Sequence, residues 1–318
     1  MRTYEFVSPK HPDKICDRIA DAILDAYLKK DPDARVAVEV MGGHGKIKIT
    51  GEITSSATVD LVSIAHKVSD SDYDVEVFVS KQSPEIARGV DNGGAGDQGI
   101  MVGYACDETP NFMPRGYELA RQLCKDIYAQ YPFDGKVQIT LDADRINAVV
   151  VSFQNSKTKD LEELVRGLIK ADRYFINPAG EWSIGGFEAD SGLSGRKLVI
   201  DNYGPYVPVG GGSFSGKDPT KVDRSGAYMA RRIAVGLLKT RNAKEVLVYL
   251  AYVIGVAEPV MKNACIFHPE PGRMGGEWVE VEGYNLKPRD IIATLELKRP
   301  IYEETASFGH FGRGFIWE

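Results

Sequence analysis

Amphipathic helices alternate along this chain with pairs of strand-like runs, and this alternation constrains the fold more than any other feature. A helix is predicted over residues 12–28, because apolar side chains recur at every fourth position from Ile15 to Tyr27. Two strand-like runs follow, at 35–41 and 46–52, and the glycine-rich turn between them predicts a hairpin. Groupings of this kind predict layered α+β units, each a sheet with helices packed on one face.

Similar groupings recur about three times along the chain, although no repeat is detectable residue by residue. We expect one unit in each of residues 1–90, 91–185 and 186–318, with the structural domains interleaved. No Pro- or Ser-rich linker separates these units. The remaining elements are predicted as helices at 115–129, 160–170, 219–239 and 288–297, and as strands at 74–79, 136–141, 147–153, 173–176, 197–201 and 245–254.

The composition is that of an ordinary soluble globular protein. The chain has 318 residues, of which 43% are hydrophobic and 26% are charged. Its formal net charge of −6 argues against nucleic acid or an anionic membrane as the main partner, and no apolar run approaches the ~18 residues of a membrane span. The four cysteines are widely separated and form no CxxC pair, which is typical of a reducing compartment and of a chain without a zinc cluster. We infer a cytoplasmic protein.

A glycine-rich run from Gly210 to Arg224 predicts a phosphate site. Its glycines let backbone N–H groups approach anionic oxygens, Lys217 and Lys221 add positive charge, and a helix is expected to begin close by. The run nearly matches a Walker loop, but Asp218 stands where that loop needs a Ser or Thr hydroxyl, so we interpret it as a phosphate loop of another kind. The alternative is a solvated glycine turn before a helix.

Two further segments place charged groups beside turns or helix starts. His11 and Asp13 open the first predicted helix, where they could meet a phosphate and a magnesium ion, or could simply cap the helix and complement its dipole. Arg196 and Lys197 follow a glycine turn and suit a polyphosphate, or a surface ion pair if taken alone. The aspartates at 17, 21 and 25 line one helix face, which we interpret as a solvated acidic stripe.

The segment from Gly89 to Gly99 is predicted to be a mobile loop that carries Asp97 and Gln98. It contains a literal GxGxxG, but a dinucleotide site needs a strand directly before the first glycine, and the nearest predicted strand ends at Val79. Glutamates 39 and 52 lie on the early hairpin, where most strand glutamates face water. Nothing in their local sequence separates them from that class.

Taken in order, these segments resemble the S-adenosylmethionine synthetase family, the methionine adenosyltransferases. The resemblance runs from Glu5 to about Arg313, and its glycine-rich lysine run and GAGDQG segment are seldom seen elsewhere. The matching segments are His11–Lys14, Gly51–Thr54, Lys81–Pro84, Gly94–Gly99, Asp190–Lys197, Gly210–Arg224, Gly255–Pro259 and Gly309–Arg313.

The resemblance implies three similar α/β units in a quasi-threefold arrangement. It also implies a homodimer or a dimer of dimers, with active sites between subunits. The expected reaction is attack of the methionine sulfur on C5′ of ATP, which expels tripolyphosphate for hydrolysis to pyrophosphate and phosphate. Two Mg²⁺ ions and K⁺ are the expected cofactors.

The resemblance also assigns site residues. The catalytic group comprises His11, Arg196, Lys217 and Lys221. Residues expected to bind ATP are His11, Asp142, Arg145, Trp182, Asp190, Arg196, Lys197, Ser213 and Lys217. Residues expected to bind methionine are Glu52, Gln82, Asp97, Asp190 and Lys221. The expected metal ligands are Asp13 and Asp223 for magnesium and Glu39 for potassium.

The chain departs from the family pattern at several positions. Trp182 replaces a stacking phenylalanine, and Arg145 stands in a hairpin where relatives carry a lysine, although arginine differs from lysine in reach and geometry. The loop before Gly94, the segment after Arg115 and the C-terminal tail are shorter than usual. Two alternatives to the synthetase are a P-loop-like phosphotransferase, which Asp218 opposes, and a nucleotide-binding homologue without turnover, which the altered hairpin would favour.

Overall fold

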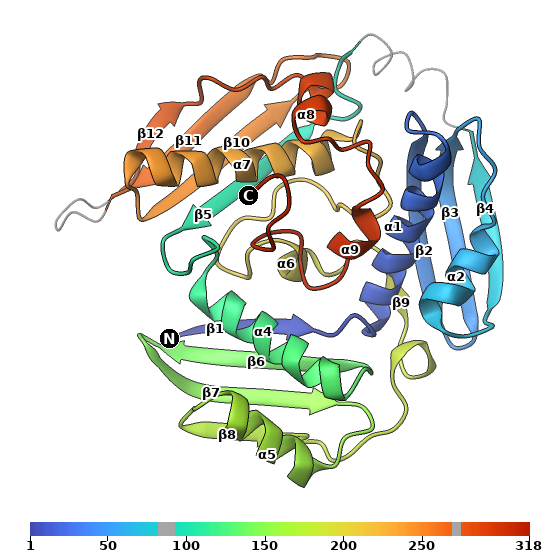
Figure 1. Ribbon diagram of the computed structural model, residues 1–318, viewed down its shortest axis with the longest axis vertical. Coiled ribbons are helices and arrows are strands. Elements are labelled where there is room, and N and C mark those ends of the chain that lie inside the picture. Colours follow the sequence, from blue (N-terminus) through green and yellow to red (C-terminus); the bar gives the residue numbers. More distant parts are fainter. Residues whose placement is uncertain (82–92, 269–274) are drawn as a thin grey trace.

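The computed structural model describes residues 1–81, 93–268 and 275–318 (Figure 1). Its strands form three four-stranded sheets, in the orders β4-β3-β2-β9, β1-β6-β7-β8 and β12-β11-β10-β5. The sheets lie around a common centre, and one long helix lies on the central side of each (Figure 1). This arrangement confirms the predicted α+β class with three similar units. None of the described helices combines the length and apolarity that crossing a membrane would take.

The first two units follow one plan, which is a long helix, a hairpin, a short helix and a strand parallel to the hairpin's second strand. The first unit consists of α1 (Pro12–Lys30), β2 (Arg35–Gly43), β3 (Lys46–Thr54), α2 (Leu61–Ser69) and β4 (Asp74–Ser80). The second consists of α4 (Arg115–Gln130), β6 (Gly135–Asp142), β7 (Arg145–Phe153), α5 (Thr158–Leu168) and β8 (Arg173–Ile176).

The third unit varies this plan, because its last strand precedes the short helix and pairs antiparallel. It consists of α7 (Val222–Arg241), β10 (Glu245–Tyr252), β11 (Met261–Phe267), β12 (Glu277–Glu280) and α8 (Pro288–Thr294). Each sheet also receives one strand from elsewhere in the chain. These strands are β9 (Gly192–Leu193) in the first sheet, β1 (Arg2–Val7) in the second and β5 (Gly99–Cys106) in the third.

The core forms where periodic apolar residues of the long helices meet the inner faces of the sheets. In α1, Ile15, Ile19 and Ile23 are buried as the spacing predicted. The C-terminal segment, which includes α9 (Tyr302–Thr305), runs through the centre between the three units (Figure 1). There the Trp317 ring stacks on Tyr228 with centroids 3.9 Å apart. In the same segment, the Phe311 carbonyl accepts a hydrogen bond from Arg121 of α4 and the Tyr302 N–H donates to Asp25 of α1, so the C-terminal segment helps to join all three units.

Three predictions from the sequence are wrong. The segment at 197–201 is not a strand, because Leu198–Asp201 forms the short helix α6, and four residues show no period that separates the two forms. The long helix begins at Val222 rather than near Pro219. The acidic stripe on α1 is not solvated: Asp17 and Asp21 are fully buried and Asp25 is 9% exposed, because loops from distant parts of the chain cover this face.

Candidate active site

His11 is the N-cap of α1 and is held in one tautomer. Its Nδ1 accepts a hydrogen bond of 3.2 Å from the backbone N–H of Asp13, so its proton lies on Nε2. Burial and the nearby Lys197 ammonium lower the pKa of His11 to about 4. The side chain is therefore a neutral hydrogen-bond donor at physiological pH, and it is 19% exposed.

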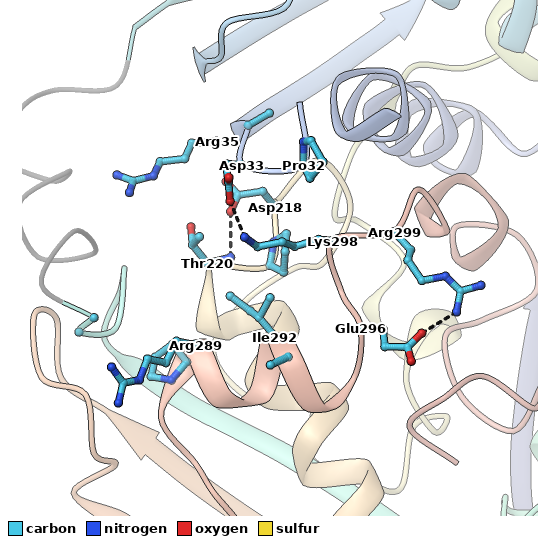
Figure 2. A pocket seen from close by; sticks show the side chains of 16 residues that line it. Pro32, Asp33, Arg35, Asp218, Thr220, Arg289, Ile292, Glu296, Lys298 and Arg299 are labelled. Atoms are coloured by element: carbon cyan, nitrogen blue, oxygen red, sulfur yellow. Dashed lines mark hydrogen bonds and ion pairs between the residues drawn. The ribbon is translucent and has the colours of Figure 1, made fainter. Parts of the chain in front are cut away.

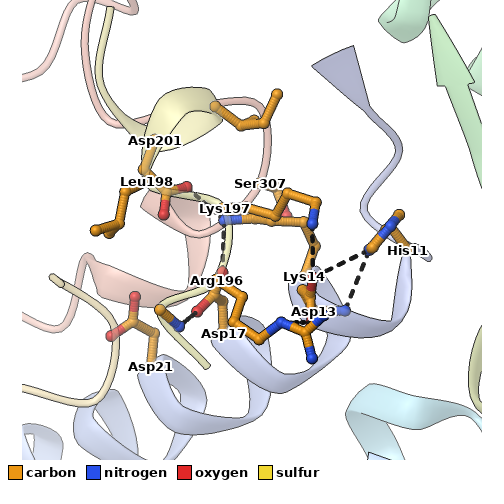
Figure 3. A network of polar contacts seen from close by, with 12 residues as sticks. His11, Asp13, Lys14, Asp17, Asp21, Arg196, Lys197, Leu198, Asp201 and Ser307 are labelled. Carbon is orange, nitrogen blue, oxygen red and sulfur yellow. Dashed lines mark hydrogen bonds and ion pairs between the residues drawn. The ribbon is translucent and has the colours of Figure 1, made fainter. Parts of the chain in front are cut away.

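Asp13, at the start of the same helix, contacts both cations of the loop at residues 190–197, here called the 190s loop (Figure 3). Its Oδ2 lies 2.6 Å from Lys197 Nζ, and its Oδ1 lies 3.5 Å from Arg196 Nε. The backbone N–H of Leu193 donates to Oδ1 at 2.9 Å. Burial alone would raise the pKa of Asp13, but the hydrogen bonds from Lys197 and Leu193 outweigh burial and lower it. Asp13 is therefore a buried carboxylate that stays ionised.

A second group of charges surrounds the start of α7. Lys217 Nζ lies 2.5 Å from Asp223 Oδ2, and the ammonium of Lys221 is paired with the carboxylate of Asp218. The glycine-rich run approaches this group closely, because a Cβ on Gly212 would lie only 2.3 Å from the Asp223 carboxylate carbon. The glycines thus bring bare backbone beside the charges, as the sequence pattern predicted.

The two charged groups adjoin each other. A Cβ built on Gly195 would lie 2.8 Å from the Cβ of Ser213, so the two glycine loops touch. Lys217 forms an isolated β-bridge with Ala37 of β2, and the Ser194 hydroxyl donates to Glu39, two residues further along the same strand. Burial raises the pKa of Glu39. The hydroxyl of Ser194 escaped the sequence analysis, although a serine inside the turn before Arg196 could have pointed to it.

The segment that carries Trp182 lies at the end of the second sheet where β6 begins. The backbone N–H of Asn155 donates to the Trp182 carbonyl at 2.9 Å, and that of Gly186 donates to Asp134 at 3.0 Å. Asp134 directly precedes Gly135, the first residue of β6, whose carbonyl accepts the N–H of Ser8. Asp190, another predicted ligand of ATP, is exposed, and its carboxylate accepts the N–H of Ser191 at 2.7 Å.

The hairpin with Asp142 and Arg145 is not brought to His11 within one chain. It lies at the end of β6 away from Ser8, and seven residues of strand separate the two ends by roughly 23 Å. Arg145 Nη2 lies 3.6 Å from Asp142 Oδ2, and its Nε lies 3.3 Å from Asp172 Oδ2. One ATP bound at His11 would therefore not contact these residues of the same chain.

Of the residues predicted to bind methionine, Lys221 belongs to the second charged group, and Glu52 is separated from the lysine loop by β2 alone, because its partner Ala37 forms the bridge with Lys217. Glu52 is exposed on β3, opposite Ala37, on the sheet face turned away from α1. Asp97 follows Ala95, which is buried and exchanges backbone hydrogen bonds with Gly255 and Val256. Gln82, with residues 89–92 of the predicted mobile loop, lies outside the described residues.

A separate pocket of about 850 Å³ is lined in part by residues 218–220, between the two lysines (Figure 2). Its walls include Arg35, Asp218, Thr220 and residues of α8. Several of its charges are already paired, because Lys298 contacts Asp33 and Arg299 lies 2.8 Å from Glu296. The predicted polyphosphate cations are absent from the described lining, so this pocket is distinct from the candidate site.

Comparison with known proteins agrees with this arrangement over the whole chain. Residues 1–91 match the N-terminal domain of S-adenosylmethionine synthetase, residues 92–182 its central domain and residues 184–318 its C-terminal domain. The S-adenosylmethionine synthase of Sorangium cellulosum (strain So ce56) is 41% identical over 374 residues, which covers 100% of this chain and 88% of the relative. That of Desulforudis audaxviator (strain MP104C) is 41% identical over 376 residues, covering 99% of this chain and 95% of the relative.

Both alignments are longer than the 318 residues of the chain, so the relatives contain segments that it lacks. The match nevertheless extends through all three domains and through every described part of the candidate site. The chain belongs to the S-adenosylmethionine synthetase family.

Proposed function

We propose that this chain forms S-adenosylmethionine from ATP and methionine at the site around His11. The methionine sulfur attacks C5′ of ATP, a C–S bond forms, and the C5′–O bond breaks with its electron pair leaving on the triphosphate. Water then hydrolyses the tripolyphosphate to pyrophosphate and phosphate. Membership of the family supports the reaction, and the observation that carries the proposed location is the contact between the two cation-bearing glycine loops at Gly195 and Ser213.

The leaving group determines which side chains the reaction needs. Tripolyphosphate carries several negative charges, and fixed cations aimed at it stabilise the transition state. We assign this role to Arg196, Lys197 and Lys217, while Lys221 would reach the methionine carboxylate. The neutral His11 would donate its Nε2 proton to a phosphate oxygen in a hydrogen bond. Trp182 would stack on the adenine and Asp190 would contact both substrates.

The carboxylates in this region fit a divalent metal. Members of the family need one, and Mg²⁺ commonly takes one or two carboxylates together with substrate phosphates and water. Asp13 and Asp223 offer two such carboxylates, each now paired with a lysine. We propose that these residues hold Mg²⁺ and that Glu39 contributes to a K⁺ site. Bound Mg²⁺ would neutralise charge that develops on the leaving phosphates.

The two aspartates and the lysines paired with them can exchange partners when substrate binds. Lys197 and Lys217 would leave their aspartates for phosphate oxygens, while the aspartates would turn to the metal. If only the metal bound, the lysines would lose their counter-charges, and if only the nucleotide bound, the aspartates would lose theirs. This favours joint binding of metal and nucleotide.

We further propose a homodimer or a dimer of dimers, with each active site shared between two chains. Asp142 and Arg145 lie apart from His11 in one chain, so a second chain would have to supply them, and we propose that Glu52 of each chain likewise serves the site of its partner. The outer face of the third sheet is apolar, with Ile100 47% exposed and Trp278 62% exposed beside Tyr249. An exposed apolar face of this kind is typical of an interface.

The four buried cysteines are free thiols, which agrees with the proposed cytoplasmic location.

The proposed activity is tested by incubating the full chain with ATP, methionine, Mg²⁺ and K⁺ and analysing for S-adenosylmethionine, pyrophosphate and phosphate. We expect all three products, and we expect transfer of the adenosyl group from ATP only when methionine is present. Nucleotide binding without product would support the homologue without turnover. A phosphorylated acceptor would support the phosphotransferase, for which Asp218 is unsuited because it is buried and accepts the backbone N–H of Val36 at 2.8 Å.

A further inference from the structure

Helix α1 carries aspartates at every fourth position, and each accepts backbone hydrogen bonds from a segment far away in the sequence. The four aspartates, Asp13, Asp17, Asp21 and Asp25, are at most 9% exposed. The donors are Leu193 N–H to Asp13, Gly195 N–H to Asp17, Gly216 N–H to Asp21, and the N–H groups of Tyr302 and Glu303 to Asp25. One helix face therefore holds three segments, and Figure 3 shows three of these aspartates, Asp13, Asp17 and Asp21, along α1.

The two middle aspartates hold the two loops that bear the proposed phosphate cations. Gly195, bonded to Asp17 at 2.8 Å, directly precedes Arg196 and Lys197. Gly216, bonded to Asp21 at 2.9 Å, directly precedes Lys217. Residues four positions apart on a helix are separated by about 6 Å along its axis. The helix thus presents two acceptors at a fixed spacing, one for each loop.

Both loops are attached to the helix through the backbone N–H of a glycine. Gly195 and Gly216 have φ values of +75° and +81°, a conformation that side chains rarely adopt, and a Cβ on Gly216 would lie 2.0 Å from the carbonyl oxygen of Val38. The bonded residues therefore offer only backbone to the helix. Because the carboxylates are buried, water cannot replace these bonds without opening the loops.

We propose that Asp17 and Asp21 are positioning residues, which set the distance between the Arg196–Lys197 loop and the Lys217 loop so that both grip one tripolyphosphate. This inference rests on the proposed function, because it assigns the purpose of the two loops. The aspartates act through the loops and have no contact with substrate in this scheme. Asp25 holds the C-terminal segment in the same way, and that segment carries none of the proposed site residues.

Asp17 is the better of the two positions to change. Asp21 also binds Arg224 through two hydrogen bonds of 2.6 and 2.8 Å, and its loss would leave a buried guanidinium without its counter-charge. Asp17 shares the Lys14 ammonium with Asp201, whose Oδ1 lies 2.5 Å from Lys14 Nζ. Asp17→Ala removes the acceptor of the Gly195 N–H, while Asp201 still compensates Lys14.

The experiment compares Asp17→Ala with the matched control Asp25→Ala, which loses bonds of the same kind on the same helix. Thermal unfolding gives the folded fraction of each variant. Steady-state kinetics are then measured with inorganic tripolyphosphate, by release of phosphate, and with ATP plus methionine. We expect both variants to be less stable, but only Asp17→Ala to lose about 10- to 100-fold in kcat, with KM changed far less, because the cations remain present but misplaced.

Equal kinetic losses in the two variants, compared at equal folded fraction, would overturn the positioning role. If Asp17→Ala does not fold, amide exchange in the unmodified protein decides. The N–H groups of Gly195 and Gly216 should then exchange as slowly as those inside α1, and fast exchange at either glycine would reject the proposal. Absence of S-adenosylmethionine formation by the unmodified chain would instead reject the proposed function and leave the exchange result interpretable by itself.

Discussion

At the scale of single residues, His11 combines a structural and a chemical role that substitution can separate. Asparagine is also a good N-cap, so His11→Asn should keep the start of α1 while removing the Nε2 donor. We expect unfolding close to that of the unmodified protein and a loss of about 10²–10³ in the rate of S-adenosylmethionine formation. Circular dichroism and a product assay measure the two effects. Near-normal turnover would remove His11 from the mechanism.

Asp134 should make stability depend on pH. Burial raises its pKa from 3.8 to about 6, although hydrogen bonds from Gly186 and Gly135 oppose that rise. Between those values the folded state binds more protons than the unfolded state, so this residue's contribution is complete below pH 4 and is lost as the pH rises through 6.

In Asp134→Asn the amide oxygen can still accept the Gly186 N–H, while the titration is gone. Denaturant unfolding at pH 4 and pH 7 should therefore show the variant gaining about 2–3 kcal/mol relative to the unmodified protein at the higher pH. A stability difference that does not change with pH would show that the Asp134 carboxyl titrates normally in the folded state.

Residue types predicted the chemistry of the site better than its geometry. Lysines and arginines beside glycines indicated an anion, and the structure gathers His11 and Asp13 with the 190s loop. The burial of Asp17 and Asp21 was missed, because spacing shows only that residues share a helix face. Which loop covers that face depends on contacts about 180 to 200 positions away, and no local pattern records them.

At the scale of elements, the loop before α7 depends on one left-handed glycine. In Gly216→Ala the new Cβ would meet the Val38 carbonyl, at a backbone conformation already unfavourable for alanine. We expect a loss of stability of about 1–3 kcal/mol and a loss of activity as Lys217 moves. Gly167→Ala is the matched control, because that glycine lies in α5 and an added Cβ would meet nothing within 4 Å; this change should stabilise by about 0.5–1 kcal/mol. Similar unfolding midpoints for the two variants would contradict the expected strain.

Elements with a strong local period were predicted, and elements defined by distant partners were missed. Helix α4 and the β6–β7 hairpin lie close to their predicted positions. Strand β1 was missed, because its six residues become a strand only by pairing with β6, and Thr3 lies opposite Thr140. Strand β5 was missed because its partner β10 is equally distant in the sequence. A short segment of this kind carries too little pattern of its own.

At the scale of the whole molecule, a shared active site can be tested by mixing two inactive chains. If Asp13 and Glu52 of one site come from different chains, a dimer of one Asp13→Ala chain and one Glu52→Gln chain has one site with both changes and one with neither. Random exchange makes about half of the dimers mixed, so about a quarter of full activity should return.

The same mixture distinguishes the opposite arrangement. If one chain supplied both residues of a site, every site in the mixed dimer would carry one change and activity would stay absent. Differently sized tags on the two chains, resolved by native mass spectrometry, would establish that exchange has taken place.

The strands that the three sheets receive from elsewhere bear on how the chain folds during synthesis. Strand β1 leaves the ribosome early, yet its partner β6 begins at Gly135, and β5 waits similarly for β10 at Glu245. Such long sequence separations slow folding and leave strand edges open to wrong partners. The Trp317 ring, which stacks in the centre, arrives after all of them. A nascent chain of this protein therefore carries unpaired edges through most of its translation, and its demand for chaperones should be greatest just before the C-terminal segment emerges.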